Sequence, residues 1–135
     1  ISKKFNVISI IDLKVSLGSL DITFHRDDLM MRDKPIIPQV NNMDFLVDNR
    51  NVILVDDVFF TGRTIRAGLD ALLAYGRPKK VELVVLIDRR FSRELPLEPN
   101  YIGKQVDSIG EQHVIVEWKE DGASDRVLLF NSKPE

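Results

Sequence analysis

Two adjacent carboxylates and a hydroxyl-rich turn lie close together in the middle of the chain. Asp56 and Asp57 follow the aliphatic run Val52–Val55, and a Thr-Gly-Arg-Thr turn at residues 61–64 comes after a short link. Carboxylates accept hydrogen bonds from sugar hydroxyls, whereas the hydroxyls and amides of a turn that opens a helix donate to phosphate. Gly62 lets the backbone approach a ligand closely. The order of these groups predicts a ribose-phosphate site.

A strand and a helix are needed to hold these groups, and the sequence predicts both. Residues 52–58 are typical of a strand buried on both faces, and open α/β sheets bind ligands at the carboxyl ends of such strands. Apolar residues recur on one helical face over 64–75, and Gly76 and Pro78 end that helix. A second aliphatic run follows at 81–87. The order strand, helix, strand predicts a right-handed crossover between parallel strands.

The rest of the chain predicts a larger sheet with one long irregular connection. Further strands are expected at residues 7–11, 15–24, 114–118 and 127–130, and the last two form a hairpin. Residues 1–5 resemble the end of a helix, and the polar segment 25–51 has little periodicity, which is typical of a functional or mobile loop. The fold class is therefore α/β, in three layers, with a mostly parallel sheet flanked by helices. A small hood after Asp88 and a C-terminal β-hairpin complete it.

Composition limits the classes of protein to which the chain can belong. The 135 residues are enough for one domain with a core, and the 44% hydrophobic and 30% charged residues are ordinary for a globular protein. The absence of cysteine excludes disulfides and thiolate metal sites, and His25 and His113 give no metal-ligand spacing. A net charge of −2 argues against nonspecific nucleic-acid binding as the main task. With no apolar run of spanning length and no signal-peptide pattern, a cytoplasmic protein is expected.

Each half of the central motif has a simpler interpretation, but the complete string is much harder to match by chance. The acidic pair alone could be an exposed turn and Thr-Gly an ordinary loop, because short motifs match by chance. The whole ordered string resembles the signature of the type I phosphoribosyltransferases. In that family the acidic pair binds the ribose hydroxyls of phosphoribosyl pyrophosphate (PRPP), and the loop binds its 5′-phosphate. The resemblance implies a PRPP site made by Asp56, Asp57, Thr61, Gly62, Arg63 and Thr64.

Three further stretches narrow the resemblance to one group. Residues 18–28, 87–96 and 101–104 resemble the bifunctional pyrimidine operon regulator/uracil phosphoribosyltransferase. That likeness implies the type I phosphoribosyltransferase fold and conversion of uracil and PRPP to UMP and pyrophosphate. It also implies binding of a pyrimidine-operon leader RNA in response to UMP or UTP, and a homo-oligomer. Magnesium would be held through the pyrophosphate of PRPP and water, as is usual for this ion.

The resemblance also implies roles for individual residues. Asp56, Asp57 and Arg26 would be catalytic, the two carboxylates by steadying an oxocarbenium ion at the anomeric carbon. Arg26, Asp27 and Asp28 would belong to a flexible loop that covers PRPP and excludes water, although a solvated loop with local ion pairs is the alternative. The base-binding residues would be Asp88, Arg89, Tyr101 and Ile102. Tyr101 could equally be an aromatic residue of the hood core.

Phe60 bears on the choice of base. Purine phosphoribosyltransferases commonly carry an aspartate just before the first threonine of the phosphate loop, where this chain has Phe60. A phenyl ring cannot transfer a proton, so a pyrimidine acceptor is favoured, whether or not Phe60 also packs in the core. A phosphoribosyltransferase for another pyrimidine and a non-catalytic sensor of PRPP or nucleotide stay open as alternatives.

The chain departs from the family at two places. The family has a helix, a strand and a pyrophosphate-binding loop before the region that matches Ile1, so residues 1–135 are expected to be an N-terminally incomplete phosphoribosyltransferase domain, inactive alone and active in the intact protein. Glu98 stands where RNA-binding members carry a basic residue. Contact with RNA would then rest weakly on Arg93 and Lys104, and the alternatives for the basic cluster are a solvated surface or a subunit contact.

Overall fold

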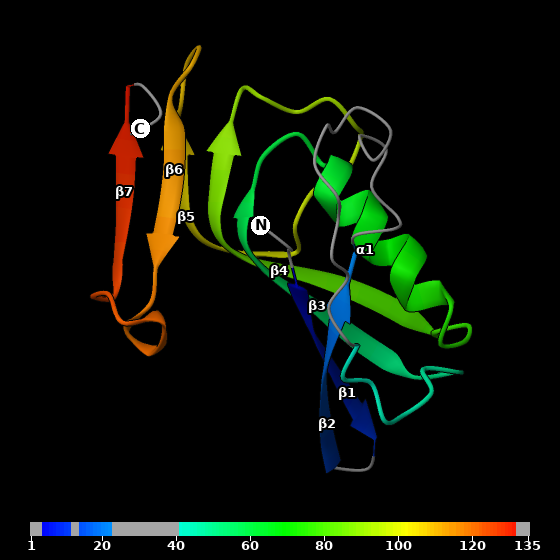
Figure 1. Cartoon of the computed structure of the whole chain (residues 1–135). Coiled ribbons are helices and arrows are strands. Elements are labelled where there is room, and N and C mark those ends of the chain that lie inside the picture. The colour runs from blue at the N-terminus through cyan, green and yellow to red at the C-terminus, as the bar shows by residue number, and fades with distance from the viewer. Residues whose placement is uncertain (1–3, 12–13, 23–40, 132–135) are drawn as a thin grey trace, which may run out of the picture.

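In the part of the chain that the structure describes, the fold combines a five-stranded sheet, one α-helix on its face and a separate hairpin (Figure 1). The computed structural model describes residues 4–11, 14–22 and 41–131, with side chains described from Val15 onward. The elements are β1 (Lys4–Ile11), β2 (Lys14–Asp21), β3 (Asn51–Phe59), α1 (Arg63–Leu73), β4 (Lys80–Arg90), β5 (Tyr101–Asp107), β6 (His113–Glu117), a 3-10 turn η3 (Lys119–Asp121) and β7 (Arg126–Phe130). Of the helices in the described part of the chain, none has the length and apolar character needed to cross a membrane.

The central sheet has the order β2-β1-β3-β4-β5. β3, β4 and β5 are parallel, and α1 lies between β3 and β4 in sequence, so the expected strand, helix, strand unit is confirmed. β1 joins this parallel part in the antiparallel sense and pairs with β2 as a hairpin. The fold is therefore of the α/β type. β1 and β2 extend its parallel strands beside β3 in the antiparallel sense.

One expected element differs at the N-terminal end. Lys4 and Phe5, which resemble the end of a helix in the sequence, begin strand β1 and pair with Asp21 and Leu20 of β2. The β-branched run that follows them favours an extended backbone, and the hairpin partner continues that conformation to Lys4. The helix expected over residues 1–5 is thus wrong at residues 4 and 5, and residues 1–3 lie outside the described part.

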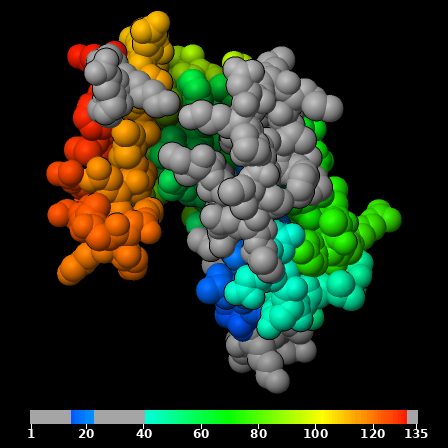
Figure 2. Space-filling view, in the orientation of Figure 1, coloured from blue at the N-terminus to red at the C-terminus, as the bar shows by residue number. Residues whose placement is uncertain are grey.

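The C-terminal strands form a sheet of their own. β6 and β7 pair in the antiparallel sense from His113 opposite Phe130 to Glu117 opposite Arg126, so the expected hairpin is confirmed. In the space-filling view the hairpin forms a ridge along one side of the molecule, coloured orange to red (Figure 2). It flanks the sheet on the side of β5 (Figure 1).

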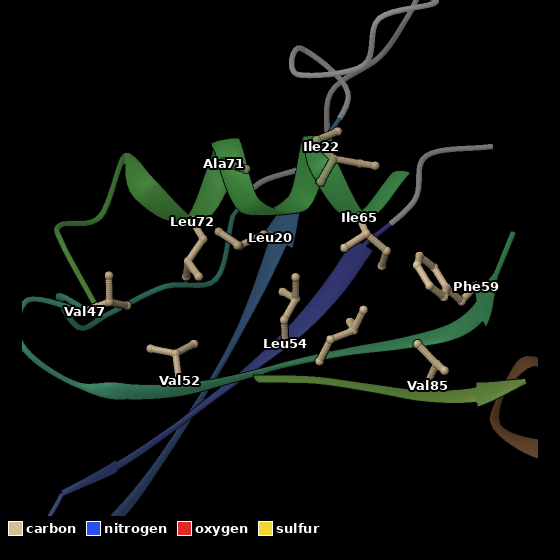
Figure 3. Packing of buried hydrophobic residues seen from close by; sticks show 12 residues of the cluster. Leu20, Ile22, Val47, Val52, Leu54, Phe59, Ile65, Ala71, Leu72 and Val85 are labelled. Atoms are coloured by element: carbon tan, nitrogen blue, oxygen red, sulfur yellow. The ribbon is translucent and has the colours of Figure 1, made fainter. Parts of the chain in front are cut away.

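The hydrophobic core lies between α1 and the sheet. Leu54, Phe59 and Val85 point from β3 and β4 toward the helix, and Ile65 and Leu72 of α1 point back toward them (Figure 3). All five side chains are at most 2% exposed. Burial of each large apolar side chain contributes about 1.5–3 kcal/mol, so this face holds α1 on the two strands that carry the candidate site.

Two neighbouring leucines of α1 allow a direct test of this packing. Leu72 is 0% exposed and Leu73 is 56% exposed. Leu72→Ala is expected to lower the free energy of unfolding by about 2–5 kcal/mol, because it leaves a cavity under the helix. Leu73→Ala is the control and should change it by about 0.5 kcal/mol or less. Chemical denaturation of the two variants measures the difference, and equal losses would contradict the described face of α1.

Candidate functional site

The acidic pair lies within β3, two residues before the strand ends. The strand predicted over residues 52–58, with the acidic pair near its end, is confirmed, and β3 continues by one residue to Phe59. Asp56 is 6% exposed and Asp57 is half-buried. The backbone N–H of Asp57 donates to Asp56 Oδ1 at 2.9 Å, and that of Val58 donates to Asp57 Oδ1 at 2.7 Å. Each carboxylate thus accepts a hydrogen bond from the next amide in the chain, which holds both side chains close to their own strand.

The strand changes the face that it buries at this pair. Val52, Leu54 and Asp56 alternate as buried positions, whereas the next fully buried residue is Phe59. The ladder between β3 and β4 runs in one register on both sides of Asp57 but includes no pair for Asp57 itself. Side chains of a regular strand alternate between faces, so the alternation is interrupted at the acidic pair. Phe59 is buried in the core under α1, whereas Asp57 stays partly accessible.

The Thr-Gly-Arg-Thr turn follows at once and opens α1. Gly62 is the N-cap with φ 94°, a left-handed conformation that favours glycine. The N–H of Arg63 donates to Thr61 Oγ1 at 3.3 Å, and the N–H of Arg66 donates to the Gly62 carbonyl at 2.9 Å. The amides before Arg66 lie ahead of the first intrahelical bond, at the positive end of the helix dipole. The turn is therefore a donor surface next to the acidic pair.

Asp88 and Arg89 lie at the end of β4, beside the start of this turn. Asp88 pairs with Phe59 in the ladder and is 4% exposed. The Arg89 guanidinium lies 3.8 Å from the Phe60 ring centroid, and its Nε donates to Ser108 Oγ at 2.9 Å. Burial lowers the pKa of Arg89 from its ordinary value, which is so high that the side chain stays charged at neutral pH. Both residues are held within the protein at the end of the sheet where the Thr-Gly-Arg-Thr turn lies.

Phe60 itself is a surface residue of this region. It is 41% exposed, so the core-packing alternative does not describe it, and its ring faces the Arg89 guanidinium instead. The contact is a cation–π pair, which stabilises the charge of a largely buried arginine. Phe60 therefore links the turn to the end of β4.

Tyr101 and Ile102 lie at the other end of β5 from Asp88. Tyr101 pairs with Val84, whereas Asp88 pairs with Gln105. Four strand positions separate those two rows, which corresponds to about 13 Å along the sheet. Tyr101 is 53% exposed, so it is no core aromatic, and Ile102 lies in the row next to it. The structure brings together Asp88, Arg89 and the turn, and leaves Tyr101 apart from them, so its base-binding role stays a prediction.

The remaining expected site residues fall into two groups. Arg26, Asp27 and Asp28 lie outside the described residues. Lys104 is exposed on β5, whereas the side chain of Arg93 is directed into the protein, with Nη2 at 2.8 Å from Asp88 Oδ1 and Nη1 at 2.5 Å from the Phe60 carbonyl. Within the described residues, no three or more His, Cys, Asp or Glu side chains gather into a group that could hold a metal ion by themselves.

Sequence reasoning missed the segment that follows Arg93. The amides of Glu94 and Leu95 donate to the Thr61 carbonyl at 2.9 and 3.1 Å, and Glu94 Oε2 lies 2.6 Å from Arg63 Nε. The stretch 93–96 is part of the family resemblance, but its residues carry no periodicity or spacing that indicates a partner. Its contact with residues 60–63 depends on how the chain returns after β4.

Comparison with known proteins places the chain in a family. A model described as phosphoribosyl transferase domain matches residues 3–121. The bifunctional protein PyrR of Limosilactobacillus fermentum is 46% identical over 123 residues, which cover 90% of this chain and 68% of that protein. The bifunctional protein PyrR of Bacillus cereus is 43% identical over 120 residues, which cover 87% of this chain and 66% of that protein.

The chain belongs to the phosphoribosyl transferase domain family. The family resemblance stated from the motifs is thereby confirmed, and the α/β fold with it. This phosphoribosyl transferase domain spans about two thirds of the length of the curated relatives that it matches. A solved hypoxanthine phosphoribosyltransferase of Staphylococcus aureus overlaps with it at a TM-score of 0.47 and 21% identity, over 61% of this chain and 45% of that one.

Gly62 provides a test of the tight turn in this domain. A Cβ at Gly62 would lie 3.3 Å from Leu95 Cβ at φ 94°, whereas one at Gly122, with φ 84°, would meet nothing within 4 Å. Gly122→Ala should therefore cost only the backbone strain, about 1 kcal/mol of unfolding free energy. Gly62→Ala should cost more, about 2 kcal/mol, because Leu95 must also shift. Chemical denaturation of both variants compares them, and an equal or smaller loss at Gly62 would refute the contact with Leu95.

Proposed function

We propose that the full-length protein is a uracil phosphoribosyltransferase, which converts uracil and PRPP to UMP and pyrophosphate. The observation that carries this proposal is the run from the acidic pair to the donor turn, Asp56 to Thr64, at the carboxyl end of a central parallel strand. Family membership supports the reaction class. Since PRPP is a charged metabolite, we also propose that the reaction takes place in the cytoplasm.

Binding of PRPP follows from the chemistry of the two halves of the site. Asp56 and Asp57 would accept hydrogen bonds from the ribose hydroxyls, and the amides and hydroxyls of Thr61–Thr64 would donate to the 5′-phosphate. Both groups are fixed to one strand end, so the sugar would be held between them in a single orientation. Positioning of this kind lowers the barrier by removing the entropy cost of bringing the reactants together.

The reaction itself exchanges one bond at the anomeric carbon. The C1′–O bond to pyrophosphate breaks, the C1′–N1 bond to uracil forms, and the N1 proton of uracil leaves to solvent or to the departing pyrophosphate. Positive charge develops on the sugar ring, and Asp56 and Asp57 stabilise it through the ribose hydroxyls that they bind. Residues 26–28, with Arg26 as a catalytic residue, are proposed to cover PRPP and exclude water from the cation.

Magnesium fits this site as an ion held largely by the substrate. Two adjacent carboxylates provide oxygen ligands of the type that Mg²⁺ prefers, and the ion usually keeps several waters. When bound, it supplies positive charge that stabilises the leaving pyrophosphate. Asp56 and Asp57 would contact it through water, while the pyrophosphate of PRPP would bind it directly.

Uracil is proposed as the base because Phe60 stands at the start of the turn. Its ring carries no group that could protonate or hydrogen-bond a purine nitrogen, and it contacts Arg89. Asp88 and Arg89 are proposed to border the pyrimidine, with Tyr101 and Ile102 contributing from β5. The alternatives are a phosphoribosyltransferase for another pyrimidine and a non-catalytic sensor of PRPP.

The acidic pair gives the test of this function. In the full-length protein, Asp57→Asn is expected to lower kcat/KM for PRPP about 10²–10³-fold, because it removes charge that stabilises the transition state. Asp70→Asn on α1 is the matched control, since Asp70 forms an exposed pair with Arg66 at 3.0 Å. UMP formation measures both variants, and full activity of Asp57→Asn would refute the proposal.

The choice of base has a test of its own. Wild-type protein should use uracil and not hypoxanthine or orotate, and turnover of hypoxanthine would refute the proposal.

A second proposed function is UMP- or UTP-responsive binding of a pyrimidine-operon leader RNA by a homo-oligomer. The support is the family resemblance, together with the exposed position of Lys104 on β5. Arg93 offers less to RNA than the sequence indicated, because its guanidinium binds Asp88 and the Phe60 carbonyl.

Salt-dependent gel shifts with leader RNA test this second function. Wild-type protein is expected to bind below micromolar concentration in the presence of UMP, and Lys104→Gln should reduce the slope of log K against log salt by about 1, the value for one phosphate contact. Lys119→Gln in the exposed η3 turn is the control and should leave the slope unchanged. RNA binding that does not depend on UMP, or equal slopes of log K against log salt for all three proteins, would count against RNA regulation through β5.

A further inference from the structure

The segment Arg93–Leu95, here called the strap, lies against the backbone that leads into the phosphate turn. Arg93 Nη1 donates to the Phe60 carbonyl at 2.5 Å. The amides of Glu94 and Leu95 both donate to the Thr61 carbonyl, at 2.9 and 3.1 Å. Two successive carbonyls of the turn are therefore bound from one side by one segment.

The direction of these carbonyls fixes the direction of the amides beyond them. In a trans peptide, the carbonyl of one residue and the N–H of the next point in opposite directions, and the described residues contain no cis peptide bond. Since the Phe60 and Thr61 carbonyls point toward the strap, the N–H groups of Thr61 and Gly62 point away from it. Those are the first two amides of the turn, and the strap holds them directed outward.

Arg93 is itself held at a defined place. Nη2 pairs with Asp88 Oδ1 at 2.8 Å, with Asp88 only 6% exposed at its side chain. The guanidinium carbon lies 3.6 Å from the centroid of the Phe59 ring, which is 1% exposed. A planar guanidinium can pair, donate to a carbonyl and stack on a ring at the same time, whereas a lysine ammonium has no plane to stack and no fork to divide between two acceptors.

Glu94 and Leu95, which follow Arg93, contact the later residues of the turn. Glu94 Oε2 lies 2.6 Å from Arg63 Nε, and Leu95 Cβ lies where a Cβ on Gly62 would meet it at 3.3 Å. The strap thus touches Phe60, Thr61, Gly62 and Arg63 in turn. The close approach leaves little room for a side chain at Gly62 on the side of the strap.

We propose that Arg93 is a positioning residue for the phosphate turn, which acts from behind by orienting the Phe60 and Thr61 carbonyls so that the Thr61 and Gly62 amides face the 5′-phosphate. This inference rests on the proposed PRPP site and assigns to Arg93 a task within it. Asp88 sets the position of Arg93, so the end of β4 is linked to the turn through one side chain.

Kinetics of the full-length protein test the role of Arg93. Arg93→Lys keeps the charge near Asp88 but not the fork and the stacking, so KM for PRPP should rise about tenfold. KM for uracil should rise less than KM for PRPP, because lysine keeps a cation beside Asp88. Arg126→Lys is the matched control, since Arg126 is exposed and pairs with Glu117 on the hairpin, and it should alter neither constant. A PRPP KM within about twofold of wild type for Arg93→Lys would overturn the proposal.

A second measurement separates this inference from the proposed reaction. Ribose 5-phosphate, which carries the phosphate but no leaving group, should shift the ¹⁵N-amide signals of Thr61 and Gly62 in wild-type protein and shift them less in Arg93→Lys. If wild type makes no UMP but shows these shifts, the proposed reaction fails and the comparison with Arg93→Lys still decides the role of the strap. Absence of ribose 5-phosphate binding by wild type would overturn both.

Thermal melting shows whether the variants remain folded. If Arg93→Lys does not fold, Asp88→Asn takes its place, because it keeps the shape of Asp88 and removes the charge that anchors Arg93. It should reduce the Thr61 and Gly62 amide shifts in the same way. Wild-type shifts in a folded Asp88→Asn protein would contradict the linkage from β4 to the turn.

Discussion

Phe59 and Asp88 pair at the end of the parallel ladder between β3 and β4, and the arrangement of the candidate site follows from that pairing. The turn that opens α1 begins two residues after Phe59, so the register sets the phosphate turn beside the end of β4. The helix must then return over the sheet, and Ile65 and Leu72 bury themselves against both strands. A shift of one residue in this register would reverse the faces of β4 and remove Asp88 from the turn.

Charged groups are buried at this end of the sheet, and each has partners that offset the cost. Desolvation of an unpaired charge is expensive, whereas a paired and hydrogen-bonded charge can be accommodated. Asp88 pairs with Arg93, and Arg89 donates to Ser108 and to the Gln112 carbonyl, which joins β4 to the segment before the hairpin. The segments that follow β4 are thus attached to the sheet by polar contacts of Arg89 and Arg93, in contrast to the apolar packing of α1.

Local sequence was sufficient for the elements and for the central motif. The aliphatic runs at β3 and β4, the apolar face of α1 and the C-terminal hairpin were all predictable, because periodicity and turn residues act within a few positions of one another. The antiparallel start at Lys4 was not, since Lys4 and Phe5 are extended by their partners in β2. Pairing across strands depends on residues distant in sequence, which a local pattern does not contain.

The same distinction between neighbouring and distant residues applies to the candidate site. Asp56, Asp57 and the turn could be recognised because strand, carboxylates and helix start are consecutive. The surroundings of Arg93 could not, since a cluster of arginines after a strand is equally consistent with a solvated surface and with RNA contacts. The distance of Tyr101 from Asp88 was also hidden, because the register of β5 against β4 is set by pairing such as that of Val84 with Tyr101. A Cβ added to Gly103 would lie 2.6 Å from the Leu86 carbonyl oxygen. A residue with a side chain would therefore clash at this position, which restricts the register of β5 against β4.

The contacts of Arg93 have a consequence for how the two halves of the site communicate. Asp88 is proposed to contact the base, and the same carboxylate pairs with the arginine that donates to the Phe60 carbonyl. A ligand that draws Asp88 away from Arg93 would loosen the phosphate turn, and a ligand that strengthens the pair would tighten it. Because the free energy of coupling between two sites is reciprocal, a phosphate bound at the turn would favour the Asp88 position that supports it. The short path from carboxylate to guanidinium to carbonyl therefore provides a physical route by which the proposed substrate PRPP would prepare the proposed base site before uracil binds.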